Sequence, residues 1–354
     1  MARTLLLGTR KALLTLTRGP RGWSLAEEAH RGIPVSYATR DARTGVTWAA
    51  LDHGHWGQKL HRQAPGGDWQ ETPAPAYPED ALSGDAPATL RYIWVIQPTP
   101  SGRIYLGTVP GGLFASDDGG ESFQLVRGLW DHPSRPKWFG GGMDQPGIHS
   151  VVVDPRDAQR LWVGVSCGGV FESADGGETW AIRNKGVAAP FLPDPEPEVG
   201  QDPHLLVCAP SNPEVLWQQN HHGVYRSDDG GQGWAEISDK DAGVFFGFPI
   251  AVHAARADTA WVVPAIGDGK RMAIGGAVKV CRTEDGGRSW TSLTRGLPQA
   301  GAYDLVYRHA LDLDGETLAF GSTTGNLWIS EDGGEGWSLV SGTLPPIYSV
   351  RFAE

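Results

Sequence analysis

Hydrophobic and polar residues alternate with a period of two in short runs along most of the chain. Arg103–Thr108 (RIYLGT), Gly112–Ser116 (GLFAS) and Ser122–Val126 (SFQLV) form one group of such runs, separated by turn residues. This period is typical of β-strands that bury one face. The pattern therefore predicts groups of three consecutive strands joined by short turns.

A fourth, continuously hydrophobic run precedes most of these groups, and such a run suits a strand that is buried on both faces. The runs are Ile93–Ile96, Val151–Val153, Leu205–Cys208, Ile250–Val252 and Leu305–Tyr307. The first group lacks this run, because the chain opens directly with Thr4–Thr9, whereas Ile347–Phe352 follows the last group. We expect the C-terminal strand to complete the first group.

An eight-residue pattern of the form Ser-x-Asp-Gly-Gly-x-x-Trp recurs within these groups. Its five copies are Ser116–Phe123, Ser173–Trp180, Ser227–Trp234, Thr283–Trp290 and Ser330–Trp337. Two earlier segments, ending at Trp23 and Trp69, keep only the closing aromatic residue. The seven closing aromatics lie 46 to 57 residues apart, close to the roughly 40 to 50 residues of a four-stranded propeller blade.

The sequence thus predicts an all-β fold, a seven-bladed β-propeller with four-stranded blades, in which the C-terminal strand closes the first blade. We expect one domain over residues 1–354. The expected blades are 1–28 with 346–354, 33–73, 90–127, 148–184, 204–238, 248–294 and 303–341. The 49 glycines and 26 prolines argue independently against a mostly helical protein.

Charge and cysteine content narrow the classes of partner. The formal net charge of -11 disfavours nucleic acid and anionic membranes as partners, since both need clustered Lys and Arg. The three cysteines, Cys167, Cys208 and Cys281, form no CxxC pair, which argues against a disulfide framework or a structural zinc site. No apolar run approaches the roughly 18 residues that span a bilayer, and no signal peptide is recognisable. We expect a cytoplasmic protein.

The five copies of the repeat resemble the Asp-box, or BNR, repeat, and the chain is similar to bacterial BNR-repeat glycosyl hydrolases and exo-sialidase-like proteins. The repeat also occurs in sialidases, xyloglucan-cleaving glycosidases, sortilin-type receptors and a photosystem assembly factor. This resemblance implies a propeller fold, and either a glycosyl hydrolase or a non-catalytic scaffold for protein partners. Sialidases need an arginine triad, and Arg31–Pro34 (RGIP) only approximates the first of its motifs. We therefore do not expect sialidase activity.

Aligning the inner strands places one residue of each blade at an equivalent position near the mouth of the propeller channel. These residues are His149, His204, Tyr92, Tyr303 and Tyr348, with Pro249 and Tyr37 at the same position in blades six and two. They form either a packing plug or a binding surface for a small polar or carbohydrate substrate. Gln145, Gln201 and Asn220, on loops of the same face, are the further expected substrate-binding residues.

Two kinds of chemistry are expected at this mouth. Glycoside hydrolysis needs two carboxylates, and Asp144 and Asp202 are the expected pair, with Asp304 and Tyr303 as further catalytic candidates. Alternatively, imidazoles could hold one divalent metal ion. The candidate metal ligands are His149, His204, His221 and His222.

Overall fold

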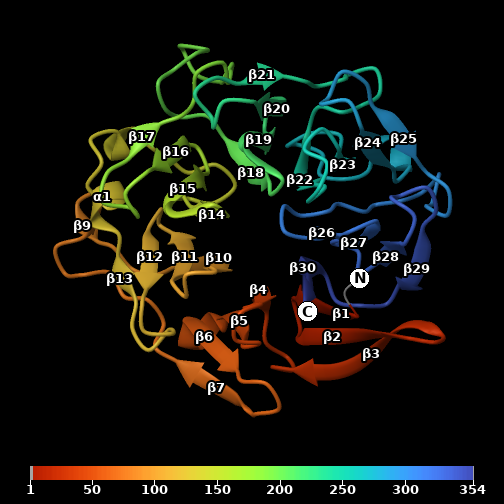
Figure 1. Ribbon diagram of the computed structural model, residues 1–354, viewed down its shortest axis with the longest axis horizontal. Coiled ribbons are helices and arrows are strands. Elements are labelled where there is room, and N and C mark those ends of the chain that lie inside the picture. Colours follow the sequence, from red (N-terminus) through yellow and green to blue (C-terminus); the bar gives the residue numbers. More distant parts are fainter. Residues whose placement is uncertain (1–2, 354) are drawn as a thin grey trace. The chain divides into compact units, whose positions relative to one another are not determined.

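The structure is a computed structural model that describes residues 3–353, and it confirms the seven-bladed β-propeller. The chain forms seven antiparallel sheets of four strands each (Figure 1). One compact unit contains Met1–Gly32 and His204–Glu354, and the other contains Ile33–Pro203. The expectation of a single domain stays a prediction.

The first unit holds four blades. Its closing blade has the order β3-β2-β1-β30, so the C-terminal strand pairs with the first strand as predicted. The strands of this unit are β1 (Thr4–Thr9), β2 (Leu13–Gly19), β3 (Gly22–Ala29), β18 (Pro203–Ala209), β19 (Asn212–Asn220), β20 (Gly223–Ser227), β21 (Ala235–Glu236), β22 (Gly247–Val252), β23 (Ala260–Pro264), β24 (Val280–Thr283), β25 (Thr291–Leu293), β26 (Leu311–Asp314), β27 (Thr317–Gly321), β28 (Leu327–Ser330), β29 (Ser338–Ser341) and β30 (Ile347–Ala353).

The second unit holds the other three blades. Their strands are β4 (Val35–Arg40), β5 (Thr47–Asp52), β6 (Gln58–Gln63), β7 (Trp69–Thr72), β10 (Tyr92–Pro98), β11 (Ile104–Val109), β12 (Leu113–Ser116), β13 (Gln124–Leu125), β14 (Ile148–Asp154), β15 (Asp157–Val165), β16 (Gly169–Ser173) and β17 (Ala181–Ile182). A small hairpin of β8 (Leu82–Ser83) and β9 (Ala86–Pro87) was not predicted. Helical structure within residues 3–353 is limited to α1 (Arg127–Trp130) and the 3-10 turns Gly54–Trp56, Arg135–Lys137 and Ile274–Gly276.

One predicted inner strand is wrong. Leu305–Tyr307 is not a strand, and the inner strand of that blade is β26, which begins at Leu311. The run is nevertheless apolar because Leu305 and Val306 are buried in the connection that leads to β26. Hydrophobicity alone marks burial, and it does not distinguish a buried loop from a buried strand.

The repeated turn is held by its own side chains. In the first copy the Ser116 hydroxyl donates to Asp118 Oδ1 (2.7 Å) and accepts from the Gly120 amide (2.8 Å). The Ser122 amide and hydroxyl both donate to the same carboxylate, at 3.0 and 2.6 Å. The Asp175, Asp229, Asp285 and Asp332 carboxylates accept equivalent bonds. Each carboxylate thus replaces the solvent hydrogen bonds of the turn and fixes the spacing of two strands.

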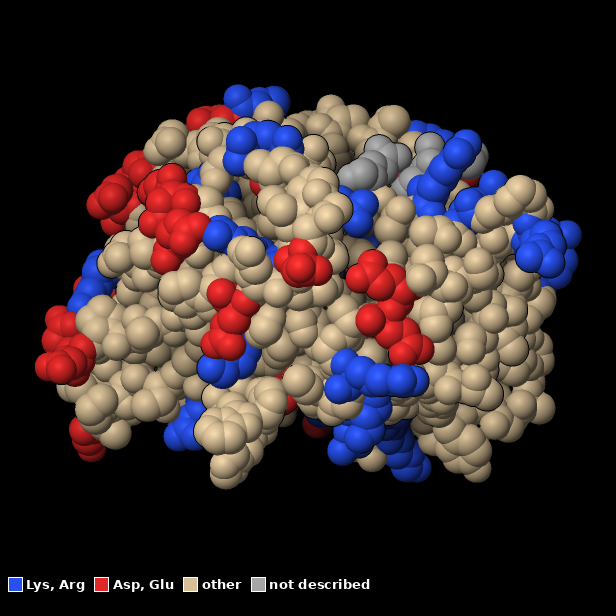
Figure 2. Space-filling view, turned by 90° about the horizontal axis from the view of Figure 1, so that it is seen from below, with Lys and Arg blue, Asp and Glu red and all other residues tan. Residues whose placement is uncertain are grey.

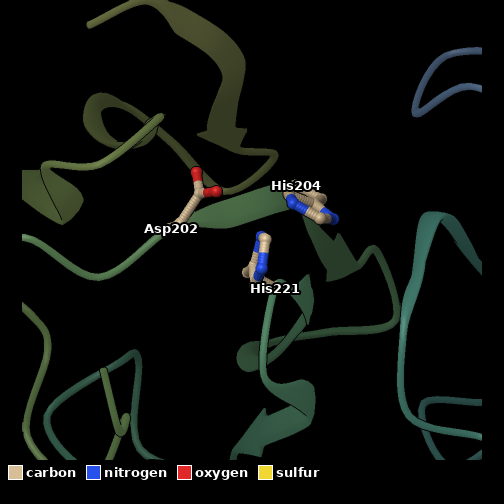
Figure 3. A group of neighbouring side chains, drawn as sticks. All are labelled: Asp202, His204 and His221. Carbon is tan, nitrogen blue, oxygen red and sulfur yellow. The ribbon is translucent and has the colours of Figure 1, made fainter. Parts of the chain in front are cut away.

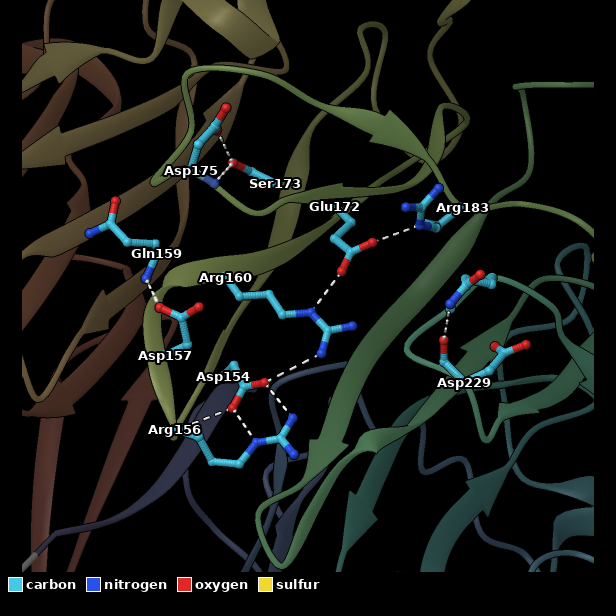
Figure 4. Close-up of polar contacts among 12 residues, drawn as sticks. Asp154, Arg156, Asp157, Gln159, Arg160, Glu172, Ser173, Asp175, Arg183 and Asp229 are labelled. Atoms are coloured by element: carbon cyan, nitrogen blue, oxygen red, sulfur yellow. Dashed lines mark hydrogen bonds and ion pairs between the residues drawn. The ribbon is translucent and has the colours of Figure 1, made fainter.

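A network of ion pairs ties together the blade made of β14 to β17 (Figure 4). Arg160 Nε donates to Glu172 Oε1 at 2.7 Å, and its guanidinium also lies 3.6 Å from Asp154. Arg156 pairs with Asp154, and Arg183 pairs with Glu172, each at 2.7 Å. Asp154 and Glu172 are both buried, so the network links the strands of this blade within a medium of low dielectric constant. It thereby positions β15, which leads directly to Ser166.

Candidate functional site

The corner that follows β15 connects the two predicted carboxylates within the second unit. Asp202 is buried, and its Oδ1 accepts hydrogen bonds from the Ser166 hydroxyl (3.0 Å) and the Cys167 amide (3.2 Å). Cys167 has a φ of 51°, in the left-handed region that residues other than glycine seldom adopt. This backbone conformation aims the Cys167 amide at Asp202.

The same corner anchors the loop that carries Asp144. The Phe139 amide donates to the Cys167 carbonyl (3.4 Å), and the Ser166 amide donates to the Gly147 carbonyl (2.8 Å). Between these anchors, Gly141 lies so close to the corner that a Cβ atom there would be 3.5 Å from Asp202 Oδ2. Asp144 itself is exposed. The corner Ser166–Cys167 therefore binds the buried Asp202 and both ends of the loop that carries the exposed Asp144.

Aromatic side chains border one end of this loop. Tyr92 and Trp94, both half-buried, lie on the same face of β10, with ring centroids 6.0 Å apart. Trp94 contacts the edge of the fully buried His149 ring at 5.6 Å and lies against Gly147. These half-buried rings are the kind of apolar surface on which a sugar ring stacks.

Two predicted substrate-binding amides have local partners. Gln145 Nε2 donates to the Ser83 hydroxyl at 3.0 Å. Gln201 is buried, and its amide donates to the carbonyls of Pro197 (2.6 Å) and Val187 (3.3 Å). The Gln201 side chain thus orders the long loop before Asp202. Its role as a substrate-binding residue stays a prediction.

In the first unit, four predicted residues lie at the start of β18, at the end of β19 and in the turn that follows β19. His204 is buried and its ring lies 5.4 Å from that of His221, while His221 lies 4.8 Å from His222. Asn220 is fully buried and its Oδ1 accepts a hydrogen bond from the His222 amide at 3.1 Å, so it shapes the turn that presents both histidines. One ligand atom from each of Asp202, His204 and His221 lies within 4.8 Å of the other two (Figure 3).

The remaining candidates are Tyr303, Asp304 and Tyr348. Tyr303 is 70% exposed and precedes the connection to β26, so it is not the first residue of an inner strand as the alignment assumed. Asp304 Oδ1 accepts bonds from Ser322, Thr324 and Asn326 at 2.6 to 2.8 Å. These bonds give Asp304 a structural role in ordering the loop between β27 and β28. Tyr348 is half-buried, and its ring lies 6.0 Å from Tyr307.

A separate polar pocket of about 700 Å³ lies among the repeated turns of the second unit. Arg103 lines it, but its guanidinium already donates to both oxygens of Asp117 and to the Gly176 carbonyl. Arg43, Asp175 and Glu178 complete the wall. Because its one central cation is satisfied by the turns themselves, this pocket has the features of a solvated groove between blades.

Sequence reasoning did not assign a role to Ser166 or Gly141. Their contribution depends on backbone hydrogen bonds and on the close approach of two loops that are distant in sequence. A serine beside a cysteine and a glycine in a glycine-rich loop carry no pattern that would have revealed this contact. The distribution of charge does not mark this contact either, since acidic and basic side chains are interspersed on the face shown in Figure 2.

With this geometry established, sequence comparison shows weak homology to xyloglucanases. A stretch of 131 residues, 36% of this chain, is 30% identical to the oligoxyloglucan-reducing end-specific xyloglucanase of Emericella nidulans, of which it covers 14%. A stretch covering 67% of this chain is 22% identical to a xyloglucanase of Paenibacillus sp. and covers 24% of that enzyme. The chain thus spans less than a quarter of these relatives. No family model matches it.

Solved structures share the fold. An ancestral GH74 enzyme has a TM-score of 0.59 at 18% identity, and the match covers 87% of this chain and 37% of the enzyme. YCF48 from Cyanidioschyzon merolae has a TM-score of 0.57 at 15% identity, and the match covers 92% of this chain and 95% of YCF48. A structure of YCF48 bound to a D1 peptide gives a TM-score of 0.52 at 13% identity, covering 91% of this chain and 86% of that protein. None of the helices within residues 3–353 has the length and hydropathy of a membrane span.

Proposed function

We propose that this protein is a carbohydrate-active enzyme of the glycoside hydrolase type, with Asp144 and Asp202 as its two carboxylates. The observation that carries the proposal is the Ser166–Cys167 corner, which binds Asp202 and anchors both ends of the Asp144 loop. Weak homology to xyloglucanases supports a polysaccharide or oligosaccharide as the substrate. The half-buried Tyr92 and Trp94 rings, near the same loop, would stack on a sugar.

The two carboxylates differ in their surroundings, since Asp202 is buried and Asp144 is exposed. Glycoside hydrolysis uses one carboxyl group to protonate the leaving oxygen and one carboxylate to activate water or attack the sugar. Asp202 is oriented by two donors on the same oxygen, so we assign it the second role. Asp144 is exposed on a glycine-rich loop that can adjust to a substrate, and we assign it the role of proton donor.

A panel of glycosides, including xyloglucan oligosaccharides, tests this proposal. We expect Asp144→Asn and Asp202→Asn each to lower kcat/KM by at least about 100-fold, because a positioned acid or base contributes about 10² to 10⁴ in rate. Asp68→Asn is the matched control, since Asp68 is an exposed aspartate on the turn between β6 and β7 of the same unit. Its kcat/KM should stay within about twofold of the parent. Unchanged activity in both site variants would refute the assignment.

A second candidate function is a non-catalytic scaffold that binds a protein segment. The observation that favours it is the structural match to YCF48, which covers 92% of this chain and 95% of YCF48. One of the YCF48 structures contains a D1 peptide. A protein that hydrolyses none of the glycosides but binds a peptide with a defined stoichiometry would support the scaffold and refute the enzyme.

We also propose that the five repeated turns are Asp-box repeats. The same hydrogen bonds, from the leading Ser or Thr hydroxyl to the Asp carboxylate, occur in all five copies. The structure offers no comparable support for sialidase activity, since the Arg31 guanidinium is exposed to solvent beside Glu28.

A further inference from the structure

We propose that Asp202, His204 and His221 form a binding site for one divalent transition-metal ion. Asp202 directly precedes β18, His204 is the second residue of that strand, and His221 follows β19, the neighbouring strand of the same sheet. The chain therefore brings the three groups together through two adjacent strands. One potential ligand atom from each lies within 4.8 Å of the other two (Figure 3).

The surroundings of His204 fix its ring in a form that can bind a metal. His204 Nδ1 lies 2.6 Å from the Gly247 carbonyl oxygen. A carbonyl can only accept, so Nδ1 carries the proton and Nε2 keeps a lone pair. Phe248 stacks on the ring at 4.5 Å and Phe246 contacts it edge-on at 5.5 Å. A carbonyl behind a ligating histidine is the usual way in which proteins orient such a ring.

His221 makes the site reachable from solvent. His221 is half-buried, in contrast to His204, and its ring contacts Phe246 at 5.4 Å.

The kind of ligand indicates the kind of ion. Two imidazole nitrogens and one carboxylate suit Zn²⁺, Mn²⁺, Fe²⁺, Co²⁺ or Ni²⁺, whereas Ca²⁺ and Mg²⁺ prefer oxygen ligands only. Metal bonds of about 2.0 to 2.2 Å require the ligand atoms to lie roughly 3.3 to 3.5 Å apart. The present separations, which are up to 4.8 Å, would have to shorten for all three atoms to bind one ion. Three protein ligands leave one position for a water molecule, which is typical of catalytic and not of structural zinc sites.

Two predicted ligands are not part of this proposal. His149 is not among the three groups that share ligand distances, and its Nδ1 is 2.8 Å from the Ser150 hydroxyl. His222 packs against His221 and its amide is bound by Asn220, but its ring is not among the three groups that share ligand distances. This makes His222 a useful test of which turn residue is the ligand.

The inference deepens the proposed function, because the two share Asp202. A metal ion at this site would take over the activation of water from the Asp202 carboxylate. Asp144 would keep its role as proton donor. Metal binding is measured without any glycoside, and glycosidase activity is measured with and without a chelator. Glycosidase activity that survives the chelator contradicts metal-assisted catalysis and is consistent with catalysis by the two carboxylates. Metal binding without any glycosidase activity supports the metal site and contradicts the proposed glycoside hydrolase.

The experiment is a titration of untagged, chelator-treated full-length protein with Zn²⁺ alone, at about pH 7.5, where imidazole is neutral. We expect about one equivalent to bind, and we expect His204→Ala and His221→Ala each to weaken binding by at least about 100-fold. His222→Ala, and His55→Ala on the exposed Gly54–Trp56 turn, should change the affinity by less than about threefold.

Folding is monitored separately because His204 is buried. Circular dichroism of each variant, together with the visible spectrum of the Co²⁺-loaded protein, distinguishes loss of a ligand from loss of structure. His221→Ala is the decisive variant, since a half-buried turn residue can be removed without opening the core. Binding of less than about a tenth of an equivalent by the parent, or full binding by folded His221→Ala, would overturn the proposal.

Discussion

At the scale of single residues, the candidate carbohydrate site depends on one strained corner. Cys167 adopts a left-handed conformation and is buried, and Ser166 and Cys167 together supply four hydrogen bonds to Asp202 and to the loop that carries Asp144. Strain of this kind costs of order 1 to 3 kcal/mol and persists where the surrounding structure fixes it. The Ser166 hydroxyl and the Cys167 amide therefore hold Asp202 in position.

Gly141→Ala tests the close approach of the Asp144 loop to this corner. A Cβ atom at position 141 would lie 2.7 Å from Cys167 Sγ and 3.3 Å from Ser166 Oγ, so the loop must shift. We expect a loss of about 1 to 3 kcal/mol in the free energy of unfolding, as for other overpacked sites, and a fall in glycoside activity. Gly142→Ala is the matched control, since a Cβ atom there has no neighbour within 4 Å. Equal effects of the two substitutions, measured by urea unfolding, would show that the corner does not constrain the loop.

Local sequence also shows its limits at this scale. Gln201 is a predicted substrate-binding residue, and its amide donates to two carbonyls of its own loop. Asp304 is a predicted catalytic residue, and three side chains of one neighbouring turn donate to it. Buried polar residues need partners whether or not they have a function. Residue type alone therefore could not separate the two roles.

At the scale of strands and sheets, prediction was most successful where covalent neighbours form the structure. The repeated turn contains its own hydrogen-bond donors and acceptors, so the pattern located the turns and their strands directly. The prediction was wrong at Leu305–Tyr307, because this irregular connection is buried and therefore as apolar as an inner strand. The pairing of Ser166–Cys167 with Phe139 and Gly147 was also beyond prediction, because backbone groups made it.

Arg160→Met tests the ion-pair network of the β14 to β17 blade. The substitution keeps an apolar stem over Trp162 but leaves Asp154 and Glu172 with one arginine each. We expect destabilisation of about 1 to 3 kcal/mol, less than for a fully broken buried pair because partners remain. Lys59→Ala, which removes a more exposed ion pair with Glu71, should cost less than about 1 kcal/mol. Urea unfolding of both variants gives the comparison, and an Arg160 effect no larger than the Lys59 effect would contradict it.

At the scale of the whole molecule, the repeated turns make the stability of the folded protein depend on pH. Hydrogen bonds from the Thr179 side chain and amide, together with the Ser173 hydroxyl, lower the pKa of Asp175 to about 2. Ser289 makes the leading contribution in lowering the pKa of Asp285 to about 2, and Ser122 acts in the same direction on the pKa of Asp118. Each folded turn therefore binds its proton less readily than the unfolded chain does.

This difference predicts the direction of the pH dependence. Because the pKa of the folded carboxyl lies below its ordinary value of 3.8, the stabilisation is complete above about pH 4 and is lost as the pH falls toward about 2. We expect the urea midpoint to decrease across that window. The double variant Asp175→Asn with Asp285→Asn should begin at a lower midpoint and show a shallower decrease. A midpoint in the parent that is constant down to about pH 2 would contradict the argument.

The pairing of β1 with β30 has a consequence for synthesis of the chain. β30 leaves the ribosome after every other strand of the seven sheets, so β1 waits with one hydrogen-bonding edge open while the rest of the chain is translated. An open edge of this kind invites pairing with another nascent chain. The turns that form from local side chains can order the intermediate sheets in the meantime, and only the final strand then removes the open edge. Slow translation of β30, or a premature stop before it, would leave that edge uncovered, with aggregation on the polysome as the expected result.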